Sequence, residues 1–144
     1  MAINFHYVDL PKFNWKVNSI KKWMHAIASE ENFKINDLSY VFCKDEYLLE
    51  MNIQHLNHDT FTDIITFDLS NDSHLPIIEA EIYISVDRVH ENAANFDKTI
   101  PNELSRVLAH GILHLCGYKD KTSSEEKIMR AKEDYYLQSS PFVK

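Results

Sequence analysis

The chain has 144 residues, of which 44% are hydrophobic and 26% charged, and these proportions are typical of a globular domain rather than a disordered polymer. Its formal net charge of −7 argues against broad binding to duplex nucleic acid, because phosphate binding usually requires a basic surface. The charge does not exclude a small cleft in which a divalent cation supplies positive charge. We expect a single domain over residues 1–144.

The compartment is predicted from the first residues and from the cysteines. The opening MAINFHYVD has no basic start followed by an apolar run, so we expect no signal peptide. No stretch approaches the roughly 20 apolar residues of a membrane span. Cys43 and Cys116 are far apart in the sequence, and we expect two reduced thiols in a cytoplasmic protein that does not contact a membrane.

In chain order, residues 3–8 alternate well enough to predict a first strand. A helix is predicted over 18–32, and a second strand over 38–43. Asp45 is a suitable N-cap for a short helix, and the β-branched and aromatic run 64–69 predicts a third strand. The helical stripe of the first helix is formed by Ile20, Trp23, Met24 and Ile27.

The second half begins with residues 78–86, whose strict alternation predicts a strand with one apolar face. Asp87 is the predicted cap of a helix that runs to Phe96, and Pro101 suits the first turn of a buried helix that ends at Cys116. A last helix follows, with a capping box predicted at Ser123 and Glu126. The pattern indicates an α+β fold: a sheet of about four strands packed against about five helices, with a metal site at the end of a buried helix in the C-terminal half.

The segment 110–120, HGILHLCGYKD, carries the clearest functional signal. His110 and His114 are four residues apart on a predicted helix, so their side chains lie about 40° apart around its axis and project from one face. Gly117 suits a helix end that needs a positive φ, after which the chain can bring Asp120 toward the histidines. Two imidazoles and one carboxylate are typical of a catalytic zinc site that keeps a position open for water.

Simpler interpretations of these residues stay open at this point. Histidines four apart on an apolar helix also occur by chance, and an aspartate between Lys119 and Lys121 is commonly just solvated. Cys116 is a chemically suitable zinc ligand. On a continuing helix, however, it would point about 200° away from His114, which favours a small buried residue.

Written as a pattern, the segment is HxxxHxxGxxD, which is similar to the ligand spacing of the metzincin metalloproteases. Those enzymes carry a glutamate base directly after the first histidine, whereas this chain has Gly111 there. A peptidase without its base would be badly impaired, so a metallopeptidase is a minor alternative.

The same segment more fully resembles the HGxLHLxGYDH signature of the YbeY family, bacterial single-strand endoribonucleases that act in ribosomal RNA maturation and ribosome quality control. Upstream, LNHDTFTDIITFD (56–68) is similar to the family's LN…TDVLSF segment, and AEIYIS (80–85) to its GDIxIS strand. Chain length and element order agree as well, so the resemblance spans nearly the whole chain.

The resemblance implies that His110 and His114 are metal ligands and that Asp120 stands at the family's third histidine. Lys119 stands where the family has aspartate. Aspartate binds zinc at about 2.0–2.2 Å and is an acceptable substitute, although it makes the site more anionic.

A second departure concerns the loop after Leu56-Asn57. Family members usually have several more residues there, including an arginine and often a lysine thought to face the active site, and HDTFT (58–62) contains neither. The residues considered to supply positive charge instead are Lys119, Lys121 and Arg106.

The remaining roles stay open. Three acidic residues are candidate general bases, but ordinary exposed carboxylates would look the same, so we name no base; they are Glu103, Asp63 and Glu81. His55 and His58 are candidate extra ligands, although His55 also fits the apolar face of its helix. Tyr118 is the aromatic nearest in sequence to the ligands, and it either stacks on a base or packs against the last helix.

Together these observations predict a zinc-dependent endoribonuclease, with one ion per chain, that hydrolyses single-stranded RNA. The resemblance implies that this RNA is ribosomal, near the 3′ end of 16S RNA, and that ribosomal subunit proteins are among the partners. The alternative from another class is a non-enzymatic ribosome-associated factor, in which zinc fixes the loop after the helix and Cys43 or His58 fills a fourth position.

Overall fold

The computed structural model describes residues 2–56, 62–70 and 75–141. The elements follow one another in the predicted order, and the fold is the predicted α+β class. They are β1 (Ile3–Tyr7), α1 (Val17–Glu30), β2 (Lys34–Cys43), α2 (Asp45–Leu56), β3 (Ile64–Asp68), β4 (Ile77–Ser85), α3 (Val86–Asn95), α4 (Ile100–Leu115) and α5 (Ser123–Leu137).

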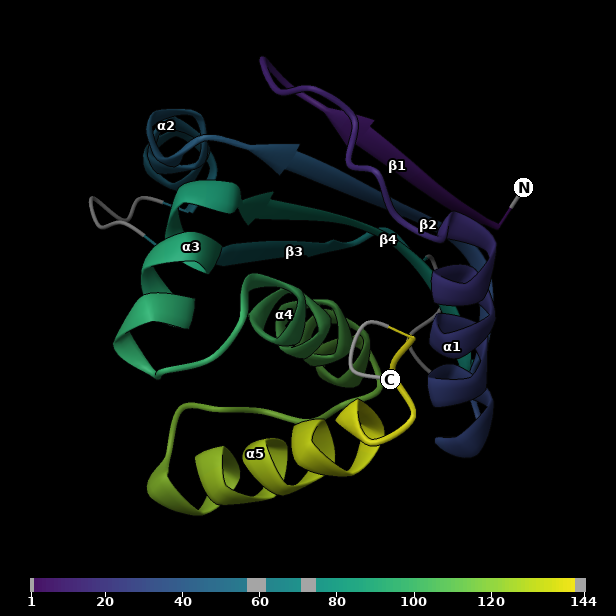
Figure 1. Cartoon of the computed structure of the whole chain (residues 1–144). Helices are drawn as coiled ribbons and strands as arrows, with labels where there is room; N and C mark the ends of the chain where they lie inside the picture. Colours follow the sequence, from purple (N-terminus) through teal and green to yellow (C-terminus); the bar gives the residue numbers. More distant parts are fainter. Residues whose placement is uncertain (1, 57–61, 71–74, 142–144) are drawn as a thin grey trace.

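The strands form one mixed sheet in the order β1-β2-β4-β3 (Figure 1). β1 and β2 are parallel, as are β2 and β4, whereas β3 runs antiparallel to β4. In the register, Phe5 lies beside Tyr40, Tyr40 beside Ile82, and Ile82 beside Thr66. One row of side chains on the lower face therefore runs across all four strands.

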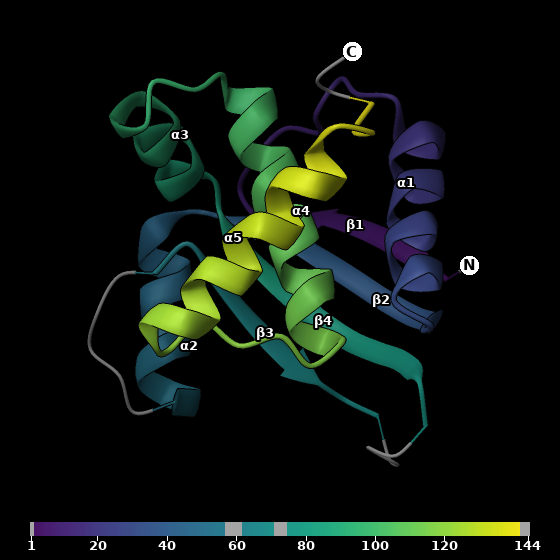
Figure 2. The same cartoon turned by 90° about the horizontal axis from the view of Figure 1, so that it is seen from below.

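The helices are arranged in layers around this sheet. In Figure 1, α1 and α4 lie below the sheet, α5 lies below α4, and α2 lies above one end of the sheet. Figure 2 shows the same arrangement from below, with α5 crossing over α4. Because α4 is enclosed between the sheet and α5, most of its length is buried.

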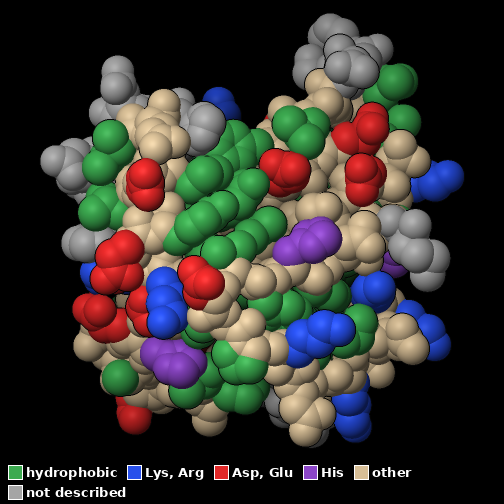
Figure 3. Space-filling model, turned by 90° about the horizontal axis from the view of Figure 1, so that it is seen from above, with side chains coloured by type: hydrophobic (Ala, Val, Ile, Leu, Met, Phe, Trp, Pro, Cys, Tyr) green, Lys and Arg blue, Asp and Glu red, His purple; other side chains and the backbone are tan. Residues whose placement is uncertain are grey.

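The main core lies between the sheet and the helices α1 and α4. Its β4 contribution is the predicted apolar face, with Ile78, Ala80, Ile82 and Ile84 all buried. On the opposite face, Leu48 of α2 forms a smaller cluster with Cys43 and Ile65 of the sheet. Figure 3, seen from above, shows hydrophobic, acidic and histidine side chains side by side on the rest of that face.

Three helix starts differ from the predicted ones. The N-cap of α3 is Ser85 rather than Asp87, because the Ser85 hydroxyl accepts the Arg88 N–H. The capping box of α5 lies one residue earlier than predicted, at Thr122 and Glu125. Asp45 begins α2, and its carboxylate binds Arg88 and the Ser85 hydroxyl. It thus joins α2 to the start of α3.

Within the described part of the chain, no helix is both long and apolar enough to cross a membrane. Cys43 and Cys116 are free thiols, as expected. Burial raises the pKa of each thiol to about 12, so both are protonated at neutral pH.

Candidate metal centre

The histidine helix is held against the sheet along its length. Thr99 caps its N-terminus, and Gly111 faces the sheet, where a Cβ would come within 2.8 Å of the Ile82 Cδ1 atom. The position that carries the catalytic glutamate in metzincins therefore points into the apolar core. This arrangement opposes the metallopeptidase alternative.

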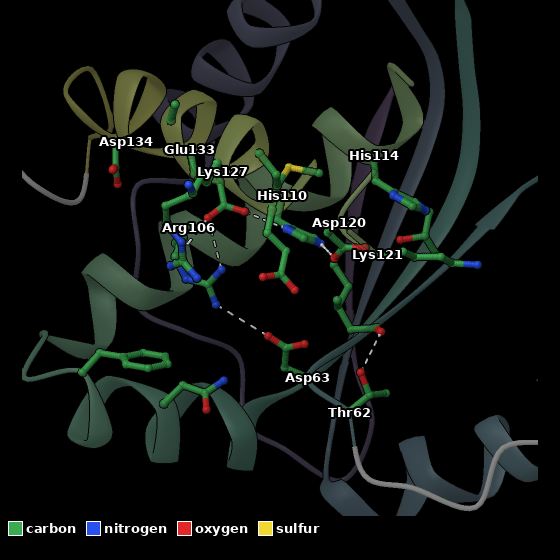
Figure 4. Close-up of a pocket in the computed structure, with 18 of the residues that line it drawn as sticks. Thr62, Asp63, Arg106, His110, His114, Asp120, Lys121, Lys127, Glu133 and Asp134 are labelled. Carbon is green, nitrogen blue, oxygen red and sulfur yellow. Dashed lines mark hydrogen bonds and ion pairs between the residues drawn. The ribbon is translucent and has the colours of Figure 1, made fainter. Parts of the chain in front are cut away.

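After α4, the chain turns as the sequence predicted. Gly117 has a φ of 107°, a conformation that glycine adopts without steric strain. The N–H of Gly117 donates to the carbonyl of His114, and the N–H of Tyr118 to that of Leu113. This closed turn sends the chain back along the helix and brings Asp120 beside His110 (Figure 4).

The two ring nitrogens of His110 have different neighbours. Nδ1 lies 2.7 Å from the Glu133 Oε2 atom, and Nε2 lies 3.3 Å from the Asp120 Oδ2 atom. Burial by itself would raise the pKa of Glu133, but the hydrogen bond with His110 and the charge of Arg106 lower it overall. An ionised Glu133 accepts the Nδ1 proton, and this contact orients the ring so that Nε2 faces Asp120.

A nitrogen and a carboxylate oxygen 3.3 Å apart share a positive charge, which is supplied either by a proton on Nε2 or by a metal ion that replaces this proton. Two ligands bound to one tetrahedral zinc ion at about 2.0–2.2 Å are about 3.3–3.6 Å apart. The separation of the Nε2 and Oδ2 atoms therefore fits two ligands of one metal ion.

His114 lies next to this pair. Its ring is nearly parallel to that of His110, with an interplanar angle of 4° and 6.4 Å between the ring centroids. Its Nδ1 atom lies 3.1 Å from the carbonyl oxygen of Tyr118. When Nδ1–H donates to this carbonyl, the Nε2 atom of His114 is also free to bind a metal.

The three predicted ligands line one pocket. In the described residues, however, no three His, Cys, Asp or Glu side chains are grouped closely enough to hold a metal ion. His110 and Asp120 form the close pair, whereas His114 is not grouped closely enough with them to complete a three-ligand metal site. The chemistry of the donors nevertheless fits zinc, because imidazole nitrogen and carboxylate oxygen are both common zinc ligands.

Behind the histidines lies a buried cluster of charges around Arg106. Its guanidinium forms ion pairs with Glu103, with Glu133 at 3.3 Å and with Asp63 at 3.6 Å. Burial opposes the charge of Arg106, but the three carboxylates raise its pKa overall. Its charge is thus already neutralised, which argues against Arg106 as a replacement for the missing loop arginine.

The pocket has a volume of about 1170 Å³ and lies between α5, the end of α4, β3 and α3. Its charged lining residues carry mixed signs, with four cations among five carboxylates. The cations are Arg106, Lys121, Lys127 and Arg130, and the carboxylates are Asp63, Asp120, Glu126, Glu133 and Asp134. Figure 4 shows Lys121 near Asp120 and Lys127 near Arg106.

Several sequence candidates lie elsewhere. Glu103 is buried against Arg106, and Glu81 accepts a hydrogen bond from Tyr83 on the far face of the sheet. Cys43 is buried under α2, which removes it as a fourth ligand. His58, Asn57 and the side chains of His55 and Leu56 lie outside the described residues.

Tyr118 packs against the core rather than lining the pocket. Its hydroxyl donates to Glu31 at 2.7 Å, and Lys132 lies 5.5 Å above its ring. Of the two interpretations of this residue, the structure supports packing against the last helix. Cys116 is also partly buried against the core.

The sequence interpretation missed Glu133, which fixes the orientation of His110. A signal was present, because Glu133 occupies the buried stripe of α5 together with Met129 and Tyr136. A carboxylate on the buried face of an amphipathic helix requires a partner. The sequence by itself did not indicate which residue of α4 that partner would be.

Comparisons with known proteins match nearly the whole chain. The sequence model of the family described as Endoribonuclease YbeY matches residues 5–140. The chain is 53% identical to an endoribonuclease YbeY of Cytophaga hutchinsonii over 123 residues, 85% of each chain. It is 45% identical to that of Flavobacterium psychrophilum, over 87% of this chain and 92% of the relative. A solution structure of a Thermotoga maritima protein is similar with a TM-score of 0.64 and 28% identity, over 94% of this chain and 88% of that one.

Proposed function

Because this chain belongs to the endoribonuclease YbeY family, we propose that it is a zinc-dependent endoribonuclease that hydrolyses single-stranded RNA. We assign His110, His114 and Asp120 as the ligands of one zinc ion per chain. The observation that carries this assignment is the 3.3 Å separation between the His110 Nε2 and Asp120 Oδ2 atoms. The hydrogen bond of Nδ1 to Glu133 supports it further, because it fixes the ring with Nε2 facing Asp120.

A zinc ion held by these residues would supply Lewis acidity toward a phosphoryl oxygen and toward water, the two requirements of phosphodiester hydrolysis. The protein residues orient the ligands. Glu133 fixes the ring of His110, and the carbonyl of Tyr118 fixes the ring of His114. The turn at Gly117 holds Asp120 beside them.

The mixed charge of the pocket supports binding of a phosphodiester. Arg106 is neutralised by its three carboxylates, so the cations available to a phosphate are Lys121 near the ligands and Lys127 on α5. Within the described residues, the side chain of neither lysine forms a hydrogen bond or an ion pair; the backbone N–H of Lys121 donates to Glu125. Their ammonium groups can therefore contact an RNA backbone without first breaking an ion pair.

Of the three carboxylates considered as general base, Asp63 lines the pocket, whereas Glu103 and Glu81 do not. Its side chain is 27% exposed and lies 3.6 Å from Arg106. Asp63 is thus the best placed of the three to accept a proton from water or from the RNA. We propose it as the first residue to test for this role.

The resemblance to the family also suggests the biological substrate. We propose ribosomal RNA near the 3′ end of 16S RNA, within maturation and quality control of the ribosome, and ribosomal subunit proteins as partners. These processes would place the protein in the cytoplasm.

The test is cleavage of a ribosomal RNA fragment with a single-stranded tail, with zinc-loaded protein, with chelator, and with His114→Ala. We expect cleavage in the tail by the zinc-loaded protein and none in the two controls. Absence of cleavage by the zinc-loaded protein would contradict the endoribonuclease assignment. Full cleavage and full zinc content in His114→Ala would contradict the ligand assignment.

A further inference from the structure

The pocket extends beyond the metal ligands to the end of α3, where Phe96 forms part of its wall. Phe96 is 53% exposed, although a phenyl ring has no polar group to satisfy in water. We propose that this ring is the platform on which one base of the RNA strand stacks while the strand passes the metal ligands. The proposal rests on the function proposed above and specifies the substrate contacts of the same site.

The surroundings of the ring favour a ligand rather than internal packing. In the part of the chain that the structure describes, Phe96 forms no contact with another aromatic ring. The comparably exposed Tyr135 differs, because its hydroxyl donates to Glu30 at 2.9 Å and its ring meets that of Tyr136. Because Phe96 is 53% exposed and meets no aromatic ring of the described residues, it offers apolar surface to a partner such as a nucleobase.

The backbone at Phe96 is held in a defined conformation. Phe96 is the C-cap of α3, and its N–H donates to the carbonyl of Asn92 at 2.9 Å. Asp97 follows with a φ of 55°, and the N–H of Lys98 donates to the carbonyl of Ala93. A helix end closed in this way presents its side chain with little loss of backbone entropy on binding.

Neighbouring residues provide the polar contacts that a nucleotide needs. Asn92 is four residues before Phe96 on the same side of α3 and lines the same pocket. Its amide offers both a donor and an acceptor to a base edge. Lys127 lines the pocket from α5, where its ammonium group can contact a phosphate of the same strand.

The size of the pocket also fits a polymer. Its volume of about 1170 Å³ exceeds the roughly 300–1,000 Å³ of a pocket for one small molecule. A chain of nucleotides can therefore occupy the ligand end and the Phe96 end together. Stacking on a phenyl ring accepts any base, so we expect the platform to bind single strands without strong sequence preference.

The experiment measures binding of a fluorescent, 2′-O-methyl phosphorothioate oligonucleotide, which resists hydrolysis, to the zinc-loaded protein by anisotropy. We expect Phe96→Ala to weaken binding by roughly 5- to 150-fold, the usual range for loss of one stacked base. Phe96→Trp should bind at least as tightly as the wild type. Tyr135→Ala, which removes an equally exposed ring outside the pocket, should bind normally. Moving an abasic site along the probe should reveal one position at which Phe96→Ala has no further effect.

Two outcomes separate the platform from the proposed function. If the wild type cleaves unmodified RNA and Phe96→Ala binds the probe as tightly as the wild type, the platform is wrong and the endoribonuclease assignment stands. If the zinc-loaded wild type neither binds the probe nor cleaves RNA, the proposed function is wrong, and the platform is wrong with it.

Discussion

Replacing Glu133 with glutamine tests how the site would hold the proposed zinc ion. The Glu133 side chain is 2% exposed, and its Oε2 atom lies 2.7 Å from the His110 Nδ1 atom. Glutamine keeps the shape and one acceptor but removes the negative charge that makes the imidazole a stronger ligand. Loss of such a partner typically lowers metal affinity 10–100-fold, about 1.4–2.7 kcal/mol. We expect Glu133→Gln to lose zinc affinity within that range.

The fold should survive this change. Arg106 loses one of three carboxylate partners but keeps Glu103 and Asp63, so its charge is not left unpaired in the interior. We expect the free energy of unfolding of the metal-free protein to fall by about 1–3 kcal/mol. Full removal of the acceptor in Glu133→Ala should cost more, because it also leaves a cavity.

Zinc affinity is measured by competition with a chromophoric chelator, and stability by urea unfolding of the metal-free protein. Asp134→Asn is the matched control, because it removes the same charge from the next residue of α5, whose side chain is exposed and lines the pocket. Equal zinc affinity in Glu133→Gln and the wild type would refute the reasoning. An equal loss in Asp134→Asn would show that net charge, and not the contact with His110, is responsible.

Four further predictions follow from the same structure. Chelation should abolish RNA cleavage, and added zinc should restore it and raise the Tm, since the ion binds the folded state; a Tm independent of zinc would contradict this. Metal analysis should find less than one zinc ion per chain in His114→Ala. His90→Ala, on the exposed surface of α3, should keep one zinc ion per chain. Gly117→Ala should lower the free energy of unfolding by about 1–2 kcal/mol in denaturant titrations, because its φ of 107° is strained for alanine; an unchanged midpoint would argue against that strain. Burial would raise the pKa of Glu31, but hydrogen bonds from Tyr136, Tyr118 and Lys132 lower it below 4.5 overall. The stability that the Glu31 carboxylate contributes is therefore fully present above pH 4.5. It is lost as the pH falls through the lowered pKa of the folded state. Glu31→Gln should therefore reduce the dependence of the unfolding free energy on pH in acid.

The sequence predicted the parts of this protein that depend on local pattern. The alternation of residues 78–86 placed the buried face of β4 correctly, and the spacing of His110 and His114 with Gly117 predicted the turn that brings Asp120 back. These predictions hold because helix and strand periodicity are local properties of the backbone.

What the sequence did not predict depends on contacts between distant elements. Glu133 forms a hydrogen bond with His110 across the interface of α5 and α4, and the Tyr118 hydroxyl donates to Glu31, 87 residues away in the sequence. The N-cap of α3 is Ser85 rather than Asp87, because the Ser85 hydroxyl accepts from the Arg88 N–H and donates to the Asp45 carboxylate. Each of these pairings is decided by packing angles between helices and strands, which one-dimensional spacing does not contain.

The attachment of α5 has a consequence for the motions of the protein. Its C-terminal end is fastened by the Trp23 indole, which donates to the carbonyl of Tyr136, and by the contact between Ser105 and Ser140. Its first half forms a wall of the pocket and is largely exposed. Opening of that half alone breaks few buried contacts, so amide hydrogen exchange should be faster near residue 126 than near Tyr136.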